Sequence, residues 1–122
     1  MLPSNSPKKD CVLAVDDEAG FLDMLKAALE CYDFTVHTAT TPKEAITVYR
    51  DHQQDIRMVL LDYVLPEMSG AVVFENLRDL NPDVRVVLLT GCEASVADKM
   101  LKSGLRGYLQ KPFSLPETKT AR

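Results

Sequence analysis

The sequence predicts a single α/β domain in which helices flank a doubly wound, five-stranded parallel sheet. Two observations carry this prediction. Three short apolar runs, at 11–15, 58–61 and 85–89 (the last one opened by Arg85), are of the kind found in strands buried on both faces of a parallel sheet. Amphipathic stretches separate these runs, so strands and helices alternate, as right-handed crossovers between parallel strands require. The length of 122 residues suffices for one domain with one core.

The first strand and helix follow a short leading segment. Residues 1–9 contain two prolines and two serines and are expected to be flexible. After the strand at 11–15, apolar residues recur at helical spacing over 19–32. Residues 34–39 alternate between apolar and polar side chains, which favours a more polar strand at an edge of the sheet.

The second helix has a clear start signal. Thr41 can cap it, Pro42 suits its first position, and Glu44 completes a capping box. We expect this helix to end near His52. His37 and His52 are expected on solvated faces.

The second half continues the alternation. The apolar run from Met58 leads into Asp62, Ser69 can cap a third helix, and Asn81-Pro82 stops that helix. The remaining expected elements are a strand at 85–89, a helix at 94–102 and a short strand at 106–110. Because the strands at 34–39 and 106–110 are the least apolar, they fit the edges of a sheet in the order 2-1-3-4-5, the order known from flavodoxin-like folds.

The bulk composition narrows the class of protein. The chain is 46% hydrophobic and 26% charged with a net charge of −4, which is typical of soluble globular proteins. Its longest basic run is Lys8-Lys9, so no direct binding of nucleic acid is expected. No apolar stretch approaches the ~20 residues of a membrane span, and no signal peptide is expected. The three cysteines fit neither a disulfide framework nor a zinc pattern, which favours reduced thiols in a cytoplasmic protein.

Polar residues follow the carboxyl ends of the strands. They are Asp16 and Asp17 after the first strand, Asp62 at the end of the third, Thr90 after the fourth and Lys111 after the fifth. In the strand order above, these residues converge on one crevice. Carboxylates held this close repel one another unless a cation lies between them, and a few hard oxygen ligands suit Mg²⁺ better than a transition metal. The set predicts a site for a dianionic group, such as a phosphoryl group carried by Asp62.

Four motifs carry a resemblance to a known family: VDDE at 15–18, LDYVLPEMSG at 61–70, LTG at 89–91 and QKPF at 110–113. With these motifs in this order, the sequence closely resembles the receiver domain of two-component response regulators. The resemblance covers about residues 10–113, which we take as the domain. Residues 114–122 begin like a helix but lack an apolar stripe, so we expect a shortened or missing fifth helix.

The resemblance implies the following metal site. Asp62 would be the phosphoacceptor in a Mg²⁺-dependent reaction. Asp17 and Asp62 would bind the ion directly, together with the backbone carbonyl of Val64. Asp16 would act mostly through water.

It also implies a switch and a set of partners. Thr90 would hydrogen-bond the phosphoryl group and Lys111 would pair with it, while Tyr108 would turn inward on activation. Lys111-Pro112 resembles the family's cis peptide bond. The donor would be a phosphohistidine on a sensor histidine kinase or phosphotransfer protein, and the signal would pass to an output domain or protein. The chain would then be a regulatory phosphoacceptor that assists only its own phosphorylation and dephosphorylation, rather than an enzyme.

The sequence departs from the family pattern at two places. Gly91 stands where the family most often has alanine. A shortened fifth helix would leave an apolar sheet face that a partner or a second copy could cover, so a homodimer is a hypothesis.

Three alternative functions remain. A pseudo-receiver that acts without phosphorylation is the main alternative. An aspartyl-phosphate hydrolase would need an acid where Val64 stands, and a flavin-binding domain would need a phosphate-binding loop where 16–18 are acidic.

Overall fold

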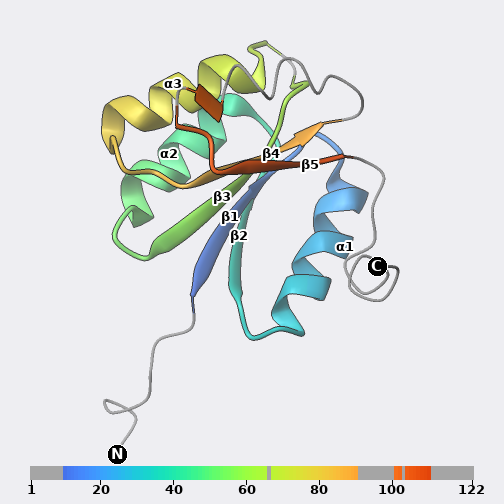
Figure 1. Ribbon diagram of the computed structural model, residues 1–122. Coiled ribbons are helices and arrows are strands. Elements are labelled where there is room, and N and C mark those ends of the chain that lie inside the picture. The colour runs from blue at the N-terminus through green and yellow to red at the C-terminus, as the bar shows by residue number, and fades with distance from the viewer. Residues whose placement is uncertain (1–9, 66, 91–100, 103, 111–122) are drawn as a thin grey trace, which may run out of the picture.

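The protein is a three-layered α/β domain (Figure 1). The computed structural model describes residues 10–65, 67–90, 101–102 and 104–110. Five parallel strands form one sheet in the order β2-β1-β3-β4-β5, which confirms the predicted order. The elements are β1 (Cys11–Val15), α1 (Ala19–Glu30), β2 (Thr35–Ala39), α2 (Pro42–His52), β3 (Ile56–Asp62), α3 (Gly70–Leu80), β4 (Val86–Thr90) and β5 (Gly107–Gln110).

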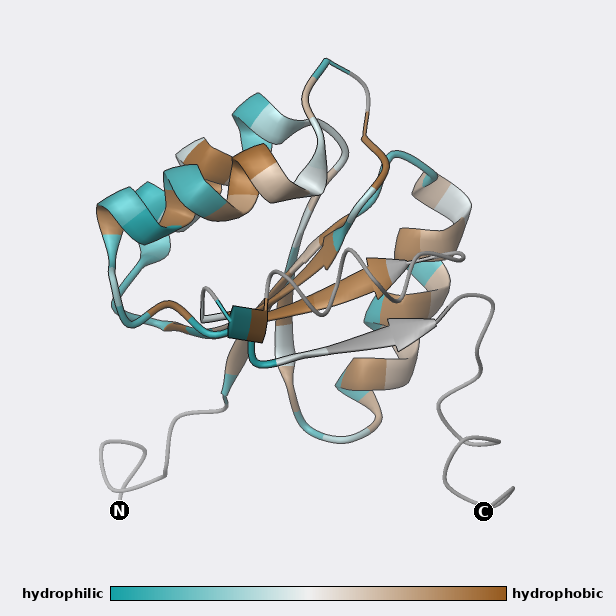
Figure 2. Ribbon diagram, turned by 45° about the horizontal axis from the view of Figure 1, so that its top comes forward, coloured by the Kyte–Doolittle hydropathy of each residue, from teal (hydrophilic) through white to brown (hydrophobic). Residues whose placement is uncertain are grey.

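Two apolar cores lie on the two faces of the sheet. One packs α2 and α3 against the sheet through buried residues such as Tyr49, Phe74 and Leu77. The other packs α1 against the opposite face through Leu22 and Leu25. Alternate side chains of β1, and of β3 between Met58 and Leu61, enter one core or the other. These stretches are therefore apolar without interruption, as the sequence predicts (Figure 2).

The helix starts follow their sequence signals. The Thr41 hydroxyl accepts a hydrogen bond from the Glu44 N–H at 3.1 Å, and the Ser69 hydroxyl accepts one from the Val72 N–H at 3.4 Å. The capping box differs in one detail. The Glu44 carboxylate accepts from the N–H of Thr40 at 2.9 Å. It thus reaches the residue before the cap.

The end of α1 corrects the predicted boundary. The helix ends at Glu30 rather than at residue 32. The chain reverses at Asp33, whose φ of 69° is left-handed, and Tyr32 lies past the helix with 44% of its surface exposed. The strands β2, β4 and β5 each begin one residue later than expected, a difference common at the ends of elements.

Some expected elements lie outside the described residues. Leu101 and Lys102 are helical, but the rest of the helix expected at 94–102 is not described. The same holds for residues 111–122, with the expected fifth helix, and for Cys92. Cys11 and Cys31 are free thiols, as expected. Within the described part of the chain, no helix is long and apolar enough to cross a membrane.

Candidate functional site

Neighbouring strands bring three acidic side chains together. Val15 of β1 pairs with Leu61 of β3, and each is followed directly by an aspartate. Asp16, Asp17 and Asp62 each offer a carboxylate oxygen, and these oxygens all lie within 4.8 Å of one another. The predicted convergence of the three carboxylates at the carboxyl edge of the sheet is therefore confirmed.

Asp16 forms the inner wall of this cluster. It is fully buried, and its backbone N–H donates to the carbonyl of Ala39 on β2 at 3.1 Å. Its Oδ1 accepts a hydrogen bond from the Glu18 N–H at 2.9 Å, which holds the carboxylate against the start of α1. Asp17 is exposed to solvent. The cluster thus has a fixed inner side and an open outer side.

Asp62 is held by the loop that follows it. Its side chain is buried, with 5% of the residue exposed, and its Oδ1 accepts a hydrogen bond from the Val64 N–H at 3.3 Å. The next residue, Tyr63, donates its backbone N–H to the carbonyl of Leu89 on β4 at 2.9 Å. Val64 itself points outward and is 70% exposed. The loop that orients the carboxylate is therefore itself anchored to the neighbouring strand β4.

Gly70 allows the loop after Asp62 to close, a role that the sequence analysis missed. Its N–H donates to the Tyr63 carbonyl at 2.7 Å. A Cβ at this position would lie 2.5 Å from the Asp62 carbonyl oxygen and 2.7 Å from Tyr63 Cα. The signal in the sequence is a glycine directly after the capping Ser69, where a helix needs no glycine. Only a residue without a side chain lets α3 begin against the backbone of Asp62 and Tyr63.

The other predicted site residues are described only in part. Leu89 of β4 pairs with Asp62 of β3. Thr90, the next residue and the last of β4, therefore lies on the strand beside Asp62. Tyr108 lies in β5 and pairs with Leu88. The side chains of Thr90 and Tyr108, and all of Lys111, lie outside the described residues, and their roles stay predictions.

The donor set fits a divalent cation of the hard, oxygen-binding kind. It consists of carboxylate oxygens, two of them buried, at separations that a single ion can bridge. Like charges this close repel one another, most of all where burial keeps water away, as at Asp16 and Asp62, and a cation offsets that repulsion. Carboxylates with an open side for water match the preference of Mg²⁺, as expected from the sequence.

Comparison with known proteins identifies the family. A family model described as the response regulator receiver domain matches residues 12–121. The probable transcriptional regulatory protein TcrX of Mycobacterium tuberculosis (strain ATCC 25618 / H37Rv) is 40% identical over 108 residues, which are 87% of this chain and 45% of that protein. This chain therefore spans less than half the length of that relative.

Solved structures agree in fold. The non-phosphorylated HemR receiver domain from Leptospira biflexa matches with a TM-score of 0.83 and 29% identity, over 92% of this chain and 90% of that chain. A response regulator protein from Burkholderia pseudomallei, with a phosphorylated aspartic acid, a calcium ion and citrate, matches with a TM-score of 0.78 and 28% identity, over 93% and 66%. With its fold, its acidic cluster and the family model that covers nearly all of it, this chain belongs to the response regulator receiver domain family.

Proposed function

We propose that this receiver domain takes a phosphoryl group from a phosphohistidine donor onto Asp62 and changes its signalling surface in response. The observation that carries the proposal is the cluster in which Asp16, Asp17 and Asp62 each place a carboxylate oxygen within 4.8 Å of the others, where the strands end. The phosphorylated aspartic acid in the Burkholderia pseudomallei relative supports it.

The chemistry needs little from the protein beyond position and charge. A carboxylate oxygen of Asp62 forms a bond to phosphorus, the bond from phosphorus to the donor imidazole nitrogen breaks, and that imidazole leaves with the electron pair and gains a proton. The Val64 N–H, at 3.3 Å from Oδ1, helps to fix the carboxylate for this attack. Bound Mg²⁺ would neutralise the charge of the carboxylates and of the phosphoryl oxygens. Asp16 and Asp17 would hold the ion with Asp62, and the backbone carbonyl of Val64 is the further ligand that we propose.

The remaining roles rest on the family resemblance. Thr90 and Lys111 would bind the phosphoryl group, and Tyr108 would report its arrival to the surface. The donor would be a sensor histidine kinase or a phosphotransfer protein, and the signal would pass to an output domain or protein. The domain is then a regulatory phosphoacceptor that promotes only its own phosphorylation and dephosphorylation.

Incubation with Mg²⁺ and a small acyl phosphate, followed by intact-mass measurement, tests the proposal. One phosphoryl adduct is expected on the unmodified chain and none on Asp62→Asn. Asp79→Asn is the matched control, because Asp79 is an exposed carboxylate on α3 and lies outside the cluster. This variant should take up the phosphoryl group as the parent chain does.

Two results would reject this function. If no adduct forms at any Mg²⁺ concentration while the protein is folded, the domain is a pseudo-receiver that binds partners without phosphorylation. If Asp62→Asn still gains one phosphoryl group and Asp79→Asn does too, the acceptor is another residue.

A further inference from the structure

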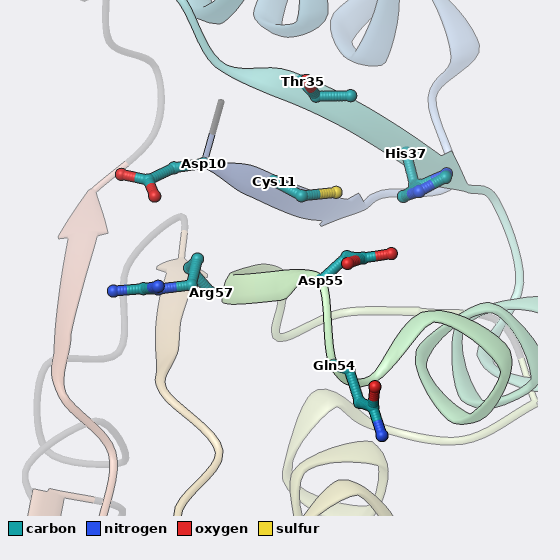
Figure 3. A pocket seen from close by; sticks show the side chains of 7 residues that line it. All are labelled: Asp10, Cys11, Thr35, His37, Gln54, Asp55 and Arg57. Atoms are coloured by element: carbon teal, nitrogen blue, oxygen red, sulfur yellow. The ribbon is translucent and has the colours of Figure 1, made fainter. Parts of the chain in front are cut away.

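A polar hollow lies at the amino-terminal end of the sheet, away from the three aspartates. It has a volume of ≈ 420 Å³ and opens beside the first residues of β1 and β3 (Figure 3). Its lining includes His37 from β2 and Asp55 from the turn before β3. Figure 3 shows the Asp55 carboxylate pointing toward the side of the hollow on which His37 lies.

The two histidines of the sequence meet beside this hollow. His37 stacks on His52, the last residue of α2, with ring centroids 4.4 Å apart and planes 24° from parallel. The expectation that both lie on solvated faces holds for His52, whereas His37 is half-buried. The Asp55 N–H donates to the His52 carbonyl at 2.9 Å, so the turn after α2 places Asp55 next to the pair. The ring contact therefore joins edge strand β2 to the end of α2.

Charged and titratable groups surround this pair from several neighbouring elements. Among the described residues they are Lys26 on α1, Arg50 and Asp51 on α2, Asp55 in the turn after it, Asp10 and Cys11 at the start of β1, and Arg57 on β3. Arg50 Nε lies 3.4 Å from Asp51 Oδ1, so the charges of these two residues offset each other. Asp10 and Arg57 also carry opposite charges, and Figure 3 shows both on the side of the hollow away from His37. Burial raises the pKa of the Cys11 thiol, which is therefore uncharged at neutral pH.

These surroundings accept one proton on the pair but oppose a second. Burial lowers the pKa of His37, and the neighbouring His52 and Lys26 lower it further, whereas the Asp55 carboxylate raises it. Asp55 can therefore balance one positive charge. A second proton would place like charges on two facing rings whose centroids are 4.4 Å apart.

We propose that the stacked pair is an acid-sensitive contact between β2 and α2, which stabilises the domain while the rings are uncharged and destabilises it once both are protonated. Uncharged aromatic rings attract each other at about this separation. Two imidazolium rings repel, and the repulsion is stronger where one of them is half-buried, because less water screens it. The effect needs no movement of either ring, because protonation alone changes the sign of the contact.

Histidine gives this contact its working range. It is the side chain whose ordinary pKa places its change of charge between about pH 5 and pH 8. The pair lies at the other end of the sheet from the three aspartates, so its response to pH does not depend on the proposed phosphorylation of Asp62.

A proton NMR titration of the ring Cε1–H resonances tests the charge coupling. The sequence has two histidines, so the two single variants assign both resonances. In the parent chain the pKa of His37 should lie below 6.5, and His52→Gln should raise it toward that value. Asp55→Asn should lower it further, because the opposing carboxylate is lost. Lys43→Gln is the matched control and should leave the pKa of His37 unchanged, because it removes an exposed positive charge about 13 Å along α2 from His52.

A double-mutant cycle measures the contact itself. His37→Gln, His52→Gln and the double variant are unfolded with urea at about pH 8 and at about pH 5. At the higher pH, the double variant should lose less stability than the sum of the two single losses, because a favourable contact is lost only once. At the lower pH it should lose more than that sum, because each single substitution already removes the repulsion. A cycle of Lys43→Gln with His52→Gln should be additive at both pH values, since these two residues are far apart.

Either of two results overturns the proposal. One is a pKa of His37 that stays the same in His52→Gln, or that rises as much in Lys43→Gln. The other is a coupling between His37 and His52 that does not change between the two pH values. Circular dichroism of each variant before the measurement shows that it is folded, so neither result can come from misfolding.

Discussion

Replacing Gly70 with alanine would place a methyl group inside the backbone that carries Asp62. The new Cβ would lie 2.5 Å from the Asp62 carbonyl oxygen and 2.7 Å from Tyr63 Cα. Contacts under 3.0 Å are essentially never seen for real Cβ atoms, so the backbone must open by at least about 0.5 Å. Both atoms belong to the main chain, and neither can move aside by a change of rotamer.

The expected cost follows from this overlap. Overpacking of this kind costs about 1–3 kcal/mol. The lower entropy of alanine in the unfolded chain offsets less than about 1 kcal/mol of that. We therefore expect Gly70→Ala to lower the free energy of unfolding by about 1–2 kcal/mol, measured by urea denaturation.

Gly20 provides a control of opposite sign. It is exposed in the first turn of α1, and a Cβ there would meet nothing within 4 Å. Gly20→Ala should raise the free energy of unfolding by up to about 1 kcal/mol, because alanine is the better helix former. The two substitutions are chemically identical, so a difference between them reports the local backbone alone.

Gly70→Ala should also disturb the acidic cluster. Movement of Asp62 and Tyr63 would alter the contact between the Val64 N–H and Asp62 Oδ1, so Mg²⁺ should bind more weakly to Gly70→Ala than to Gly20→Ala. Titration of each variant with Mg²⁺ measures this. If Gly70→Ala is as stable as the parent chain and binds Mg²⁺ equally well, the reasoning from the close approach is refuted.

Two further predictions concern metal and pH. Mg²⁺ should relieve repulsion in the aspartate cluster and raise the free energy of unfolding by about 2.7 kcal/mol at one hundred times its dissociation constant, which raises the melting temperature. Most of this gain should vanish in Asp17→Asn, and an unchanged melting temperature of the parent chain at millimolar Mg²⁺ would contradict the prediction. Folding lowers the pKa of His37 from 6.5, so below that pH the unfolded chain binds more protons than the folded domain does. The free energy of unfolding should therefore decrease as the pH falls. His37→Gln should lose less stability between pH 7.5 and pH 5.5 than the parent chain; an equal or larger loss would show that folding does not lower the pKa of His37.

Much of the fold could be predicted because its signals are local and strong. The unbroken apolar runs at 11–15 and 58–61 mark strands that are buried on both faces, and such strands have few alternatives. Thr41 and Ser69 start their helices through their own hydroxyl groups. The three acids could be predicted to meet because parallel strands end at the same edge of a sheet.

What could not be predicted depends on contacts between distant residues or on backbone angles. The end of α1 is set by the left-handed Asp33, for which no glycine gives a signal. The stacking of His37 on His52 joins residues from two elements, and their spacing in the sequence says nothing about it. The need for glycine at position 70 arises from the approach of one loop to its own strand, which only coordinates reveal.

The burial of β1 also sets a timescale for the site. Each residue of this strand is at most 4% exposed, and the strand is hydrogen-bonded to β2 on one side and to β3 on the other. Its amides can exchange with deuterated solvent only when the sheet itself opens, so they should be among the slowest in the domain. Asp16 follows this strand without a break, and its position is therefore kept for as long as the domain remains folded. Of the three acids, Asp17 is the exposed one, and it marks the side from which the proposed phosphoryl donor would approach.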